Sequence, residues 1–249
     1  MKTIDMNNMK IIKVKNYEEM SQKAAKLVEA QVLVKRNSVL GLATGSTPEG
    51  MYQELAKKYR NDEVDFKDVV AFNLDEYYPI SADNDQSYAH YMREHFFQHV
   101  NIQENNRNIP DGLNKDVQAS CRAYDRALEA AGNVDLQILG IGTNGHIGFN
   151  EPDEHFAVGT HLVDLNEKTI QDNARFFEHI DEVPKQALSM GVGSIMHAKK
   201  IVLLASGKNK AEAIRAMVKG PVTPELPASI LQMHQDVTLI IDEEAASEL

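Results

Sequence analysis

Short runs of almost uninterrupted apolar residues alternate along this chain with stretches of helical periodicity. Strands that are covered on both faces of a parallel sheet have this near-continuous apolar character. The expected strands are Lys10–Val14, Val39–Ala43, Val69–Leu74, Val134–Leu139, His161–Leu165, Ile201–Ala205 and Val237–Ile241. This alternation predicts an α/β fold, with a Rossmann-like, doubly wound and mainly parallel sheet flanked by helices.

The segments between these runs have the periodicity of helices that bury one face. Tyr17–Arg36, for example, repeats apolar residues at three- and four-residue steps. Proline fits the first turn of a helix, where no backbone donor is lost, so several prolines mark helix starts. Further helices are expected to begin near Pro48, Gln86, Asp116, Pro184, Lys208 and Pro227. The length of 249 residues suits a single domain, 1–249, in which residues 1–8 are expected to be a dispensable N-terminal extension.

Composition excludes several classes of partner. The formal net charge is −11, and nonspecific nucleic-acid binding needs a basic surface that neutralises phosphates. The single cysteine, Cys121, excludes an internal disulfide and a cysteine metal cluster. The chain has no run of 18 apolar residues, and its first ten residues lack the apolar core of a signal peptide. We therefore expect a cytoplasmic protein that binds neither nucleic acid nor membrane.

Four segments that follow expected strands carry most of the chemistry, and parallel sheets bind ligands at these carboxyl ends. The first segment has the sequence Gly41-Leu42-Ala43-Thr44-Gly45-Ser46-Thr47-Pro48. Its hydroxyl groups, its glycine and the start of a helix are the components of a phosphate-binding loop. No Gly-Lys-Ser/Thr follows, so the segment is not a P-loop. A phosphate loop and a well-capped turn between strand and helix fit it equally well.

Two adjacent carboxylates, Asp75 and Glu76, follow the strand that ends at Leu74. Successive residues of a strand point in opposite directions, so only one of the two is expected to enter the site. A carboxylate at the mouth of an apolar strand can act as a general base, with a pKa set by its surroundings. The alternative is a helix cap or a salt-bridged pair, which is the commoner role of an isolated Asp-Glu.

A glycine-rich segment, Gly140–Pro152, follows the expected strand Val134–Leu139. Its first glycines match the spacing of a dinucleotide-binding motif, but that motif requires a helix directly afterwards. The later glycine, asparagine and proline would break such a helix. The segment is therefore interpreted as a loop that presents His146, a side chain suited to proton transfer near neutral pH, with Glu151 placed to orient and charge it.

The fourth segment, Ser206–Ala211, again joins a strand to a helix start. A lysine there can pair with a phosphate as a point charge, and the alternative is a solvated side chain for either Lys208 or Lys210. No cofactor motif is present, and the histidines lack the His-Glu-x-x-His order of a zinc site. A phosphate loop, a carboxylate base and a histidine relay together favour proton-transfer chemistry on a sugar phosphate.

These motifs together resemble the glucosamine-6-phosphate deaminase family, also described as glucosamine/galactosamine-6-phosphate isomerases. The resemblance extends from about Lys10 to the C-terminus. It rests on five strings: Gly-Leu-Ala-Thr-Gly-Ser-Thr-Pro (41–48), Phe-Asn-Leu-Asp-Glu-Tyr (72–77), Gly-His-Ile-Gly-Phe-Asn-Glu-Pro (145–152), Asn-Ala-Arg-Phe-Phe (173–177) and Val-Pro-Lys-Gln-Ala-Leu (183–188).

The resemblance implies a mechanism and a set of site residues. His146, assisted by Glu151, would open the pyranose ring, and Asp75 would carry the C2 proton to C1 through an enolamine before ammonia leaves C2. Asn144 would complete the catalytic group. The residues implied for substrate and phosphate binding are Ala43, Thr44, Gly45, Ser46, Thr47, Gly142, Arg175 and Lys210. No metal and no organic cofactor is implied.

Two departures from the family pattern matter. Many members have Asp where this chain has Asn144, so a carboxylate–histidine–carboxylate relay is reduced to one carboxylate here. The resemblance implies that allosteric, hexameric members place basic and hydroxyl groups where this chain has Glu154, His161 and Val163. We therefore expect no activation by N-acetylglucosamine 6-phosphate and a monomeric protein, with a homo-oligomer as the alternative.

Two other functions remain as alternatives. A 6-phosphogluconolactonase would share this fold, but that family typically has Asp-Glu-Arg after the second strand and an Asp-Gly-His loop, where this chain has Asp75-Glu76-Tyr77 and Asn144-Gly145-His146. A non-catalytic sugar-phosphate sensor would keep the phosphate loops and could lose the proton-transfer groups, which are all present.

Overall fold

The apolar runs of the chain form the centre of one large sheet. In this computed structural model, which describes residues 2–6 and 9–249, the sheet has eight strands in the order β1-β2-β11-β10-β7-β3-β4-β6. Every neighbouring pair from β2 to β6 is parallel. The strands are β1 (Lys2–Met6), β2 (Met9–Val14), β3 (Val39–Leu42), β4 (Val70–Asn73), β6 (Arg107–Asn108), β7 (Leu136–Leu139), β10 (Ile201–Ala205) and β11 (Val237–Asp242).

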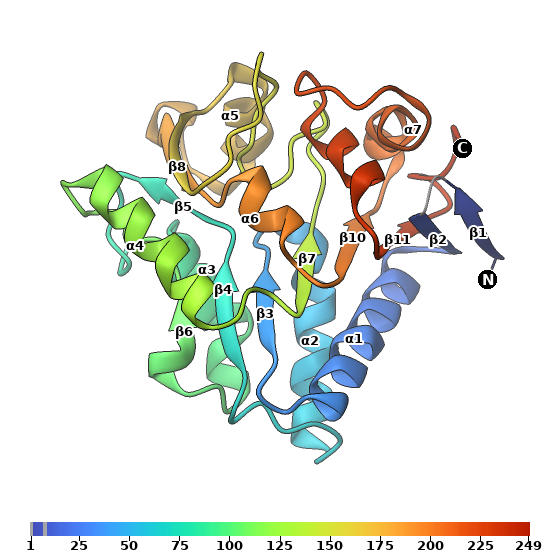
Figure 1. Cartoon of the computed structure of the whole chain (residues 1–249), viewed down its shortest axis with the longest axis horizontal. Helices are drawn as coiled ribbons and strands as arrows, with labels where there is room; N and C mark the ends of the chain where they lie inside the picture. Colours follow the sequence, from blue (N-terminus) through green and yellow to red (C-terminus); the bar gives the residue numbers. More distant parts are fainter. Residues whose placement is uncertain (1, 7–8) are drawn as a thin grey trace.

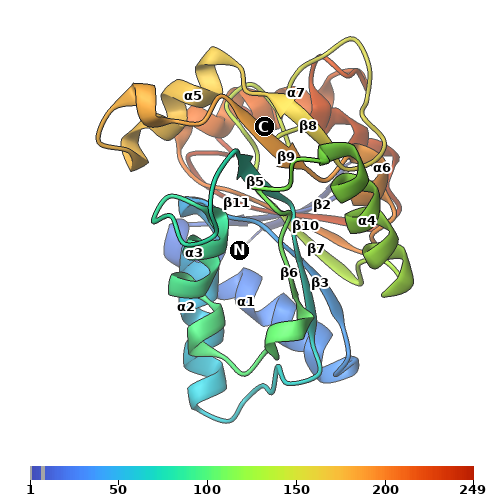
Figure 2. The same ribbon diagram turned by 90° about the vertical axis from the view of Figure 1, so that its left-hand side faces the viewer.

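Helices cover both faces of this sheet, as the alternating pattern predicts. Figure 2 shows α1, α2 and α3 on one side of the strands and α4 and α6 on the other. The helices are α1 (Tyr17–Val34), α2 (Ser46–Arg60), α3 (Tyr88–His95), α4 (Val117–Ala130), α6 (Val192–Met196) and α7 (Ala211–Lys219), with short 3-10 helices η1 (Phe97–His99), η2 (Glu104–Asn106), η5 (Lys208–Lys210) and η6 (Pro227–Met233). The predicted fold class, a single-domain, doubly wound α/β protein, is confirmed.

Side-chain caps fix where several helices begin. The carboxylate of Asp116 accepts a hydrogen bond from Ala119 N at 3.0 Å, and the hydroxyl of Ser87 accepts one from His90 N at 3.0 Å. Such caps satisfy backbone donors that have no partner within the helix. The helix expected near Gln86 therefore begins two residues later, at Tyr88, behind its Ser87 cap.

A second, smaller sheet corrects two expectations. It consists of β5 (Asp75–Tyr78), β9 (Gln186–Ser189) and β8 (His161–Asp164), all antiparallel. The helix expected near Pro184 is wrong, because the chain there enters β9, whose backbone pairs with a strand on each side. The strand expected at His161–Leu165 exists, but it lies in this small sheet and not in the parallel one.

The small sheet and the helices that connect β8 to β9 form a cover at one end of the molecule. Figure 1 shows β8 and α5 above the carboxyl ends of β3 and β4. A cluster of buried apolar residues, separate from the main core, packs beneath this cover. The remaining elements of the cover are α5 (Glu167–Asn173), η3 (Ala174–Phe176) and η4 (Ile180–Glu182). In the part of the chain that the structure describes, none of the helices is both long enough and apolar enough to span a bilayer.

The N-terminal segment adds a strand that the sequence did not predict. β1 pairs antiparallel with β2, from Lys2 opposite Lys13 to Met6 opposite Met9, and forms one edge of the large sheet. Met1, Asn7 and Asn8 lie outside the described residues. β1 pairs at the edge of the sheet that lies far from β3 and β4 in the strand order. That residues 1–8 are dispensable stays a prediction, which can be tested directly.

We expect the protein without residues 1–8 to fold cooperatively. Its melting temperature should fall by only about 2–4 °C per kcal/mol of lost edge pairing. Thermal unfolding of the full and shortened proteins measures this difference. A shortened protein that no longer unfolds cooperatively would contradict the prediction.

Candidate active site

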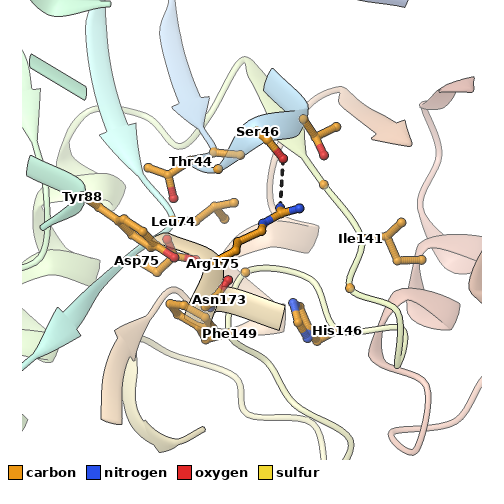
Figure 3. Close-up of a pocket in the computed structure, with 16 residues that line it drawn as sticks. Thr44, Ser46, Leu74, Asp75, Tyr88, Ile141, His146, Phe149, Asn173 and Arg175 are labelled. Atoms are coloured by element: carbon orange, nitrogen blue, oxygen red, sulfur yellow. Dashed lines mark hydrogen bonds between the residues drawn. The ribbon is translucent and has the colours of Figure 1, made fainter. Parts of the chain in front are cut away.

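A cavity of about 140 Å³ lies at the carboxyl ends of the parallel strands, where three of the four predicted segments meet. Figure 3 shows Thr44 and Ser46 at one end of it, with Asp75 and His146 as separate groups around Arg175. Residues far apart in the sequence line the cavity: Ala43, Thr44, Gly45, Ser46, Thr47, Leu74, Asp75, Tyr88, Gly140, Ile141, Gly142, His146, Gly148, Phe149, Asn173 and Arg175.

Residues 43–47, which we call the phosphate loop, join β3 to α2. Gly45 has a φ of 91°, a conformation that favours glycine, and it precedes α2 without a side-chain cap. The first backbone N–H groups of α2 are therefore available to a ligand, and the helix dipole places partial positive charge there. The helix begins at Ser46, two residues before the expected start near Pro48, which lies in the first turn.

Tyrosine phenols bind the carbonyl oxygens of the phosphate loop. Tyr52 Oη donates to Ala43 O at 2.6 Å, Tyr91 Oη to Gly45 O at 2.7 Å and Tyr17 Oη to Ser46 O at 2.8 Å. Carbonyl oxygens carry partial negative charge and would repel an anion. Because the phenols satisfy three of them, the loop is held in one conformation whose N–H groups remain for an anionic ligand.

The cover supplies a cation to the same loop. Arg175, in η3, donates from Nη2 to Ser46 Oγ at 3.1 Å, as the dashed line in Figure 3 shows. Lys210 does not line the cavity; it lies half-buried near Asp172 and Arg175. Burial lowers the pKa of Lys210, and the charge of Asp172 opposes that change. Arg175 therefore lines the cavity, whereas Lys210 lies near Arg175 but is not among the lining residues.

The two adjacent carboxylates diverge, as the alternation of a strand predicts. Asp75 lines the cavity and is 6% exposed. Glu76 is 2% exposed and points away, accepting hydrogen bonds from Tyr77 N at 2.9 Å, Tyr88 N at 2.8 Å and Ala89 N at 2.8 Å. One carboxylate therefore faces the site, and the other caps the N-terminus of α3.

Burial shifts the proton affinity of both carboxylates upward. Desolvation first, and then the charge of Glu76, raise the pKa of Asp75 to about 8. Desolvation also raises the pKa of Glu76 to about 7, although its three backbone hydrogen bonds act in the opposite direction. A carboxyl group with a pKa near the working pH can both take and return a proton.

His146 faces the cavity and is backed by a carboxylate. Its Nδ1 lies 3.5 Å from Glu151 Oε2 and 3.4 Å from Thr169 Oγ1. Asn144 Nδ2 donates to the same Glu151 oxygen at 2.7 Å, and Asn144 Oδ1 accepts from His146 N at 3.2 Å. Burial acts to raise the pKa of Glu151, but the interactions with His146, Thr169 and Asn144 outweigh it and lower this pKa. Glu151 is therefore held ionised behind the imidazole.

The glycine-rich loop allows this imidazole to lie against the backbone. A Cβ atom at Gly142 would overlap the ring of His146, so only glycine fits there. The loop is closed by hydrogen bonds from Gly142 N to His146 O at 2.9 Å and from Gly145 N to Gly142 O at 3.0 Å. In the described residues the chain runs from β7 to β8 without a helix, which agrees with the rejection of a dinucleotide motif.

Several cavity residues were missed from the sequence. Tyr88 reaches the site from the start of α3, and its ring is stacked on Phe149 with centroids 5.9 Å apart. Asn173 arrives from the end of α5 in the cover. The Ser-Tyr pair that begins α3 was a visible capping signal, but nothing in the sequence placed that helix beside Asp75.

Among the described residues no group of three or more His, Cys, Asp or Glu side chains is placed to hold a metal ion. His90 and His95 of α3 are partly buried, and neither is among the residues that line the cavity. The expectation that the reaction uses neither a metal nor an organic cofactor stays a prediction.

Comparison with known proteins identifies relatives of this chain. The family described as glucosamine-6-phosphate isomerases/6-phosphogluconolactonase matches residues 14–240. A glucosamine-6-phosphate deaminase of Thermoanaerobacter sp. (strain X514) is 58% identical over 239 residues, 96% of this chain and 94% of that protein. A glucosamine-6-phosphate deaminase of Halothermothrix orenii is 58% identical over 241 residues, 97% of this chain and 100% of that protein.

Solved structures separate the two activities in the family name. A structure described as a monomeric glucosamine-6-phosphate deaminase has a TM-score of 0.94 at 46% identity, covering 96% of this chain and 99% of its own. The 6-phosphogluconolactonase of Thermotoga maritima has a TM-score of 0.74 at 20% identity, covering 94% and 99%. The second likeness is one of fold alone, whereas the first confirms the resemblance that the motifs indicated. The chain belongs to the family of glucosamine-6-phosphate isomerases and 6-phosphogluconolactonases.

Proposed function

We propose that this chain is a glucosamine-6-phosphate deaminase, which converts D-glucosamine 6-phosphate and water into D-fructose 6-phosphate and ammonia in amino-sugar catabolism. Deaminases at 58% identity over almost the whole chain support this function. The observation that carries it is the placement of Asp75 and His146 around one cavity with the phosphate loop at its end. A sugar phosphate anchored at that loop would present its first carbons to both side chains.

The phosphate of the substrate would bind at the phosphate loop. Unused N–H groups at the start of α2 and the hydroxyls of Thr44, Ser46 and Thr47 are suitable donors for its oxygens. Arg175 would neutralise part of its charge, and Lys210 would add a second cation from behind. Binding energy released at the phosphate is then available to orient carbons that lie several bonds away.

Ring opening would be the task of His146. The imidazole would take the proton of the O1 hydroxyl and return a proton to the ring oxygen O5 as the C1–O5 bond breaks, so the net charge is unchanged. Glu151 would stabilise the imidazolium that exists between the two transfers, because it is held ionised 3.5 Å away. Asn144 would keep Glu151 and the loop in position through its two hydrogen bonds.

Asp75 would then move one proton between adjacent carbons. Its carboxylate takes the C2 proton, and O1 takes a proton from the ammonium group on C2, which gives a neutral enolamine with a double bond between C1 and C2. The same carboxyl group returns the proton to C1, and the nitrogen lone pair forms an iminium at C2. Water adds to C2 and ammonia leaves, which gives the ketone of fructose 6-phosphate. A base whose pKa is raised to about 8 retains the proton long enough to return it.

Product analysis tests the proposal. Purified protein with glucosamine 6-phosphate and a metal chelator should release ammonia and fructose 6-phosphate in equal amounts. Binding of the sugar phosphate without turnover would favour the sensor alternative instead. Hydrolysis of 6-phosphogluconolactone without deamination would favour the lactonase.

The Asp75→Asn variant separates the base from the rest of the site. It should lose at least about a thousandfold in kcat, at the middle of the range for an acid–base group, while its affinity for fructose 6-phosphate changes little. Isothermal titration and steady-state kinetics give the two quantities. Full turnover by this variant would show that Asp75 is not the base.

The same variant should also be more stable than the wild type at high pH. The folded pKa of Asp75 is raised above its unfolded value, so its stabilising protonation is complete below about pH 4 and is lost as the pH rises through about 8. Asp75→Asn does not titrate. Its melting temperature should exceed that of the wild type by at least about 2–4 °C at about pH 9 and by less at about pH 4. A difference that does not grow with pH would contradict the burial of this charge.

The chain is further proposed to be an unregulated monomer in the cytoplasm. The family resemblance implies that Glu154, His161 and Val163 stand where allosteric members have basic and hydroxyl groups, and a solved deaminase at 46% identity is described as monomeric. The rate should depend hyperbolically on substrate and should not respond to N-acetylglucosamine 6-phosphate. Light scattering should give a mass near 27.8 kDa, and a hexameric mass would contradict the proposal.

A further inference from the structure

Glu76 is a buried carboxylate that takes no part in the chemistry proposed above. It adjoins Asp75 in β5, is 2% exposed and does not line the cavity. Burying a charged group is unfavourable unless hydrogen bonds compensate it. Three backbone N–H groups provide that compensation, two of them at the start of α3, where the helix dipole adds to the effect. The Glu76 carboxylate thus connects β5, the strand that carries Asp75, to the start of α3 by hydrogen bonds across twelve residues of the chain.

The helix held by Glu76 reaches the phosphate loop at two points. Tyr91, one turn into α3, donates its phenol hydrogen to Gly45 O at 2.7 Å. Tyr88, whose backbone nitrogen Glu76 holds, lines the cavity and interacts with the side chain of Thr44. Figure 3 shows Tyr88 in the same part of the cavity as Thr44 and Asp75, and the phenol of Tyr88 interacts with both. α3 therefore lies between the base and the phosphate loop and contacts both.

We propose that Glu76 is a positioning residue, which fixes the phosphate loop relative to the reacting carboxylate of Asp75 through α3. The proposal rests on the proposed deaminase function, because only a substrate that is held at its phosphate and attacked at C2 requires this spacing. A displacement of about 1 Å between a bound substrate and its catalytic group can reduce the rate about a hundredfold. Glu76 sets the spacing without touching the substrate.

The loop itself should bind phosphate without help from Glu76. Its donors belong to the start of α2, and its carbonyls are also held by Tyr52 and Tyr17, which do not lie on α3. Loss of Glu76 should therefore affect alignment more than phosphate affinity. This difference separates a positioning role from a general weakening of the fold, which would affect both quantities.

The first variant is Glu76→Gln. Its single amide oxygen cannot accept from all three N–H groups, so at least one donor at the start of α3 loses its partner. We expect kcat to fall about tenfold or more, while the inhibition constant of inorganic phosphate stays within about twofold of the wild-type value. Both kcat and the inhibition constant are measured in the pH range where they no longer change with pH. This is necessary because removal of the Glu76 charge also lowers the pKa of Asp75.

A second variant and a control complete the test. Tyr91→Phe removes the bond to Gly45 at the other end of the connection and should lower kcat in the same selective way, by a smaller factor. Asp116→Asn makes the same change from a carboxylate to an amide at the exposed N-cap of α4, whose residues do not line the cavity, and should leave both constants unchanged. Tyr91→Phe decides the question if Glu76→Gln does not fold.

Three results would overturn the proposal. They are a kcat within about twofold of wild type in both variants, a phosphate inhibition constant that weakens in parallel with kcat, or an equal loss in Asp116→Asn. Wild-type protein that releases no ammonia and fructose 6-phosphate would refute the proposed function itself, so the two failures are distinguishable.

A measurement without turnover tests the same connection. Inorganic phosphate added to the labelled wild-type protein should shift the backbone amide resonances of Thr44–Thr47 and also those of Tyr88 and Ala89. In Glu76→Gln the shifts at Thr44–Thr47 should remain, and those at Tyr88 and Ala89 should be lost. Equal shifts at Tyr88 and Ala89 in both proteins would contradict a connection through Glu76.

Discussion

Burial of the Asp75 carboxylate beside a second buried carboxylate is the constraint on which the rest of the site depends. Two adjacent acids at the end of an apolar strand cannot both be solvated or both face one small cavity. The strand separates them, so Glu76 takes the backbone donors of α3 and Asp75 keeps the cavity. Desolvation by burial, with no hydrogen-bond donor to its carboxylate among the described residues, raises the pKa of Asp75 to about 8, which suits the proposed role of a base that returns the proton it removes.

The phosphate loop solves a different problem with neutral groups. A loop that binds an anion must direct its N–H groups inward and its carbonyls outward, and here tyrosine phenols hold the carbonyls of Ala43, Gly45 and Ser46. The chain as a whole is acidic, with a net charge of −11, so local donors and Arg175 must provide the attraction that the overall charge does not. In the proposed mechanism, substrate binding and proton transfer therefore take place at separate ends of one cavity.

Much of the parallel sheet could be predicted because its strands are buried on both faces. β3, β4, β7, β10 and β11 begin and end within about three residues of the apolar runs that indicated them. β5 and β9 were missed because their pairing depends on each other and on β8, and no local pattern contains that information. The alternating exposure of β8 is typical of an antiparallel strand at a surface. Its mixture of polar and apolar residues was the one sign in the sequence that this strand lies outside the parallel sheet.

The candidate site divides in the same way. Asp75, His146 and the phosphate loop could be predicted because each follows a core strand directly, and parallel strands bring such ends together. Tyr88 and Asn173 could not, because α3 and the cover reach the cavity through packing that depends on the whole fold. A helix cap is the alternative that the sequence offers to a base for the Asp-Glu pair, and the structure places Glu76 at the start of α3 and Asp75 at the cavity.

The central claim is that one fixed carboxylate transfers the proton between C2 and C1 on one face of the substrate. It is tested most directly by running the reaction in deuterium oxide and locating deuterium in the product by NMR. A single base at Asp75 predicts that all deuterium incorporated at C1 of fructose 6-phosphate occupies one of the two prochiral positions. Deuterium distributed equally over both positions would contradict the account, because it would mean that no single fixed group delivers the proton.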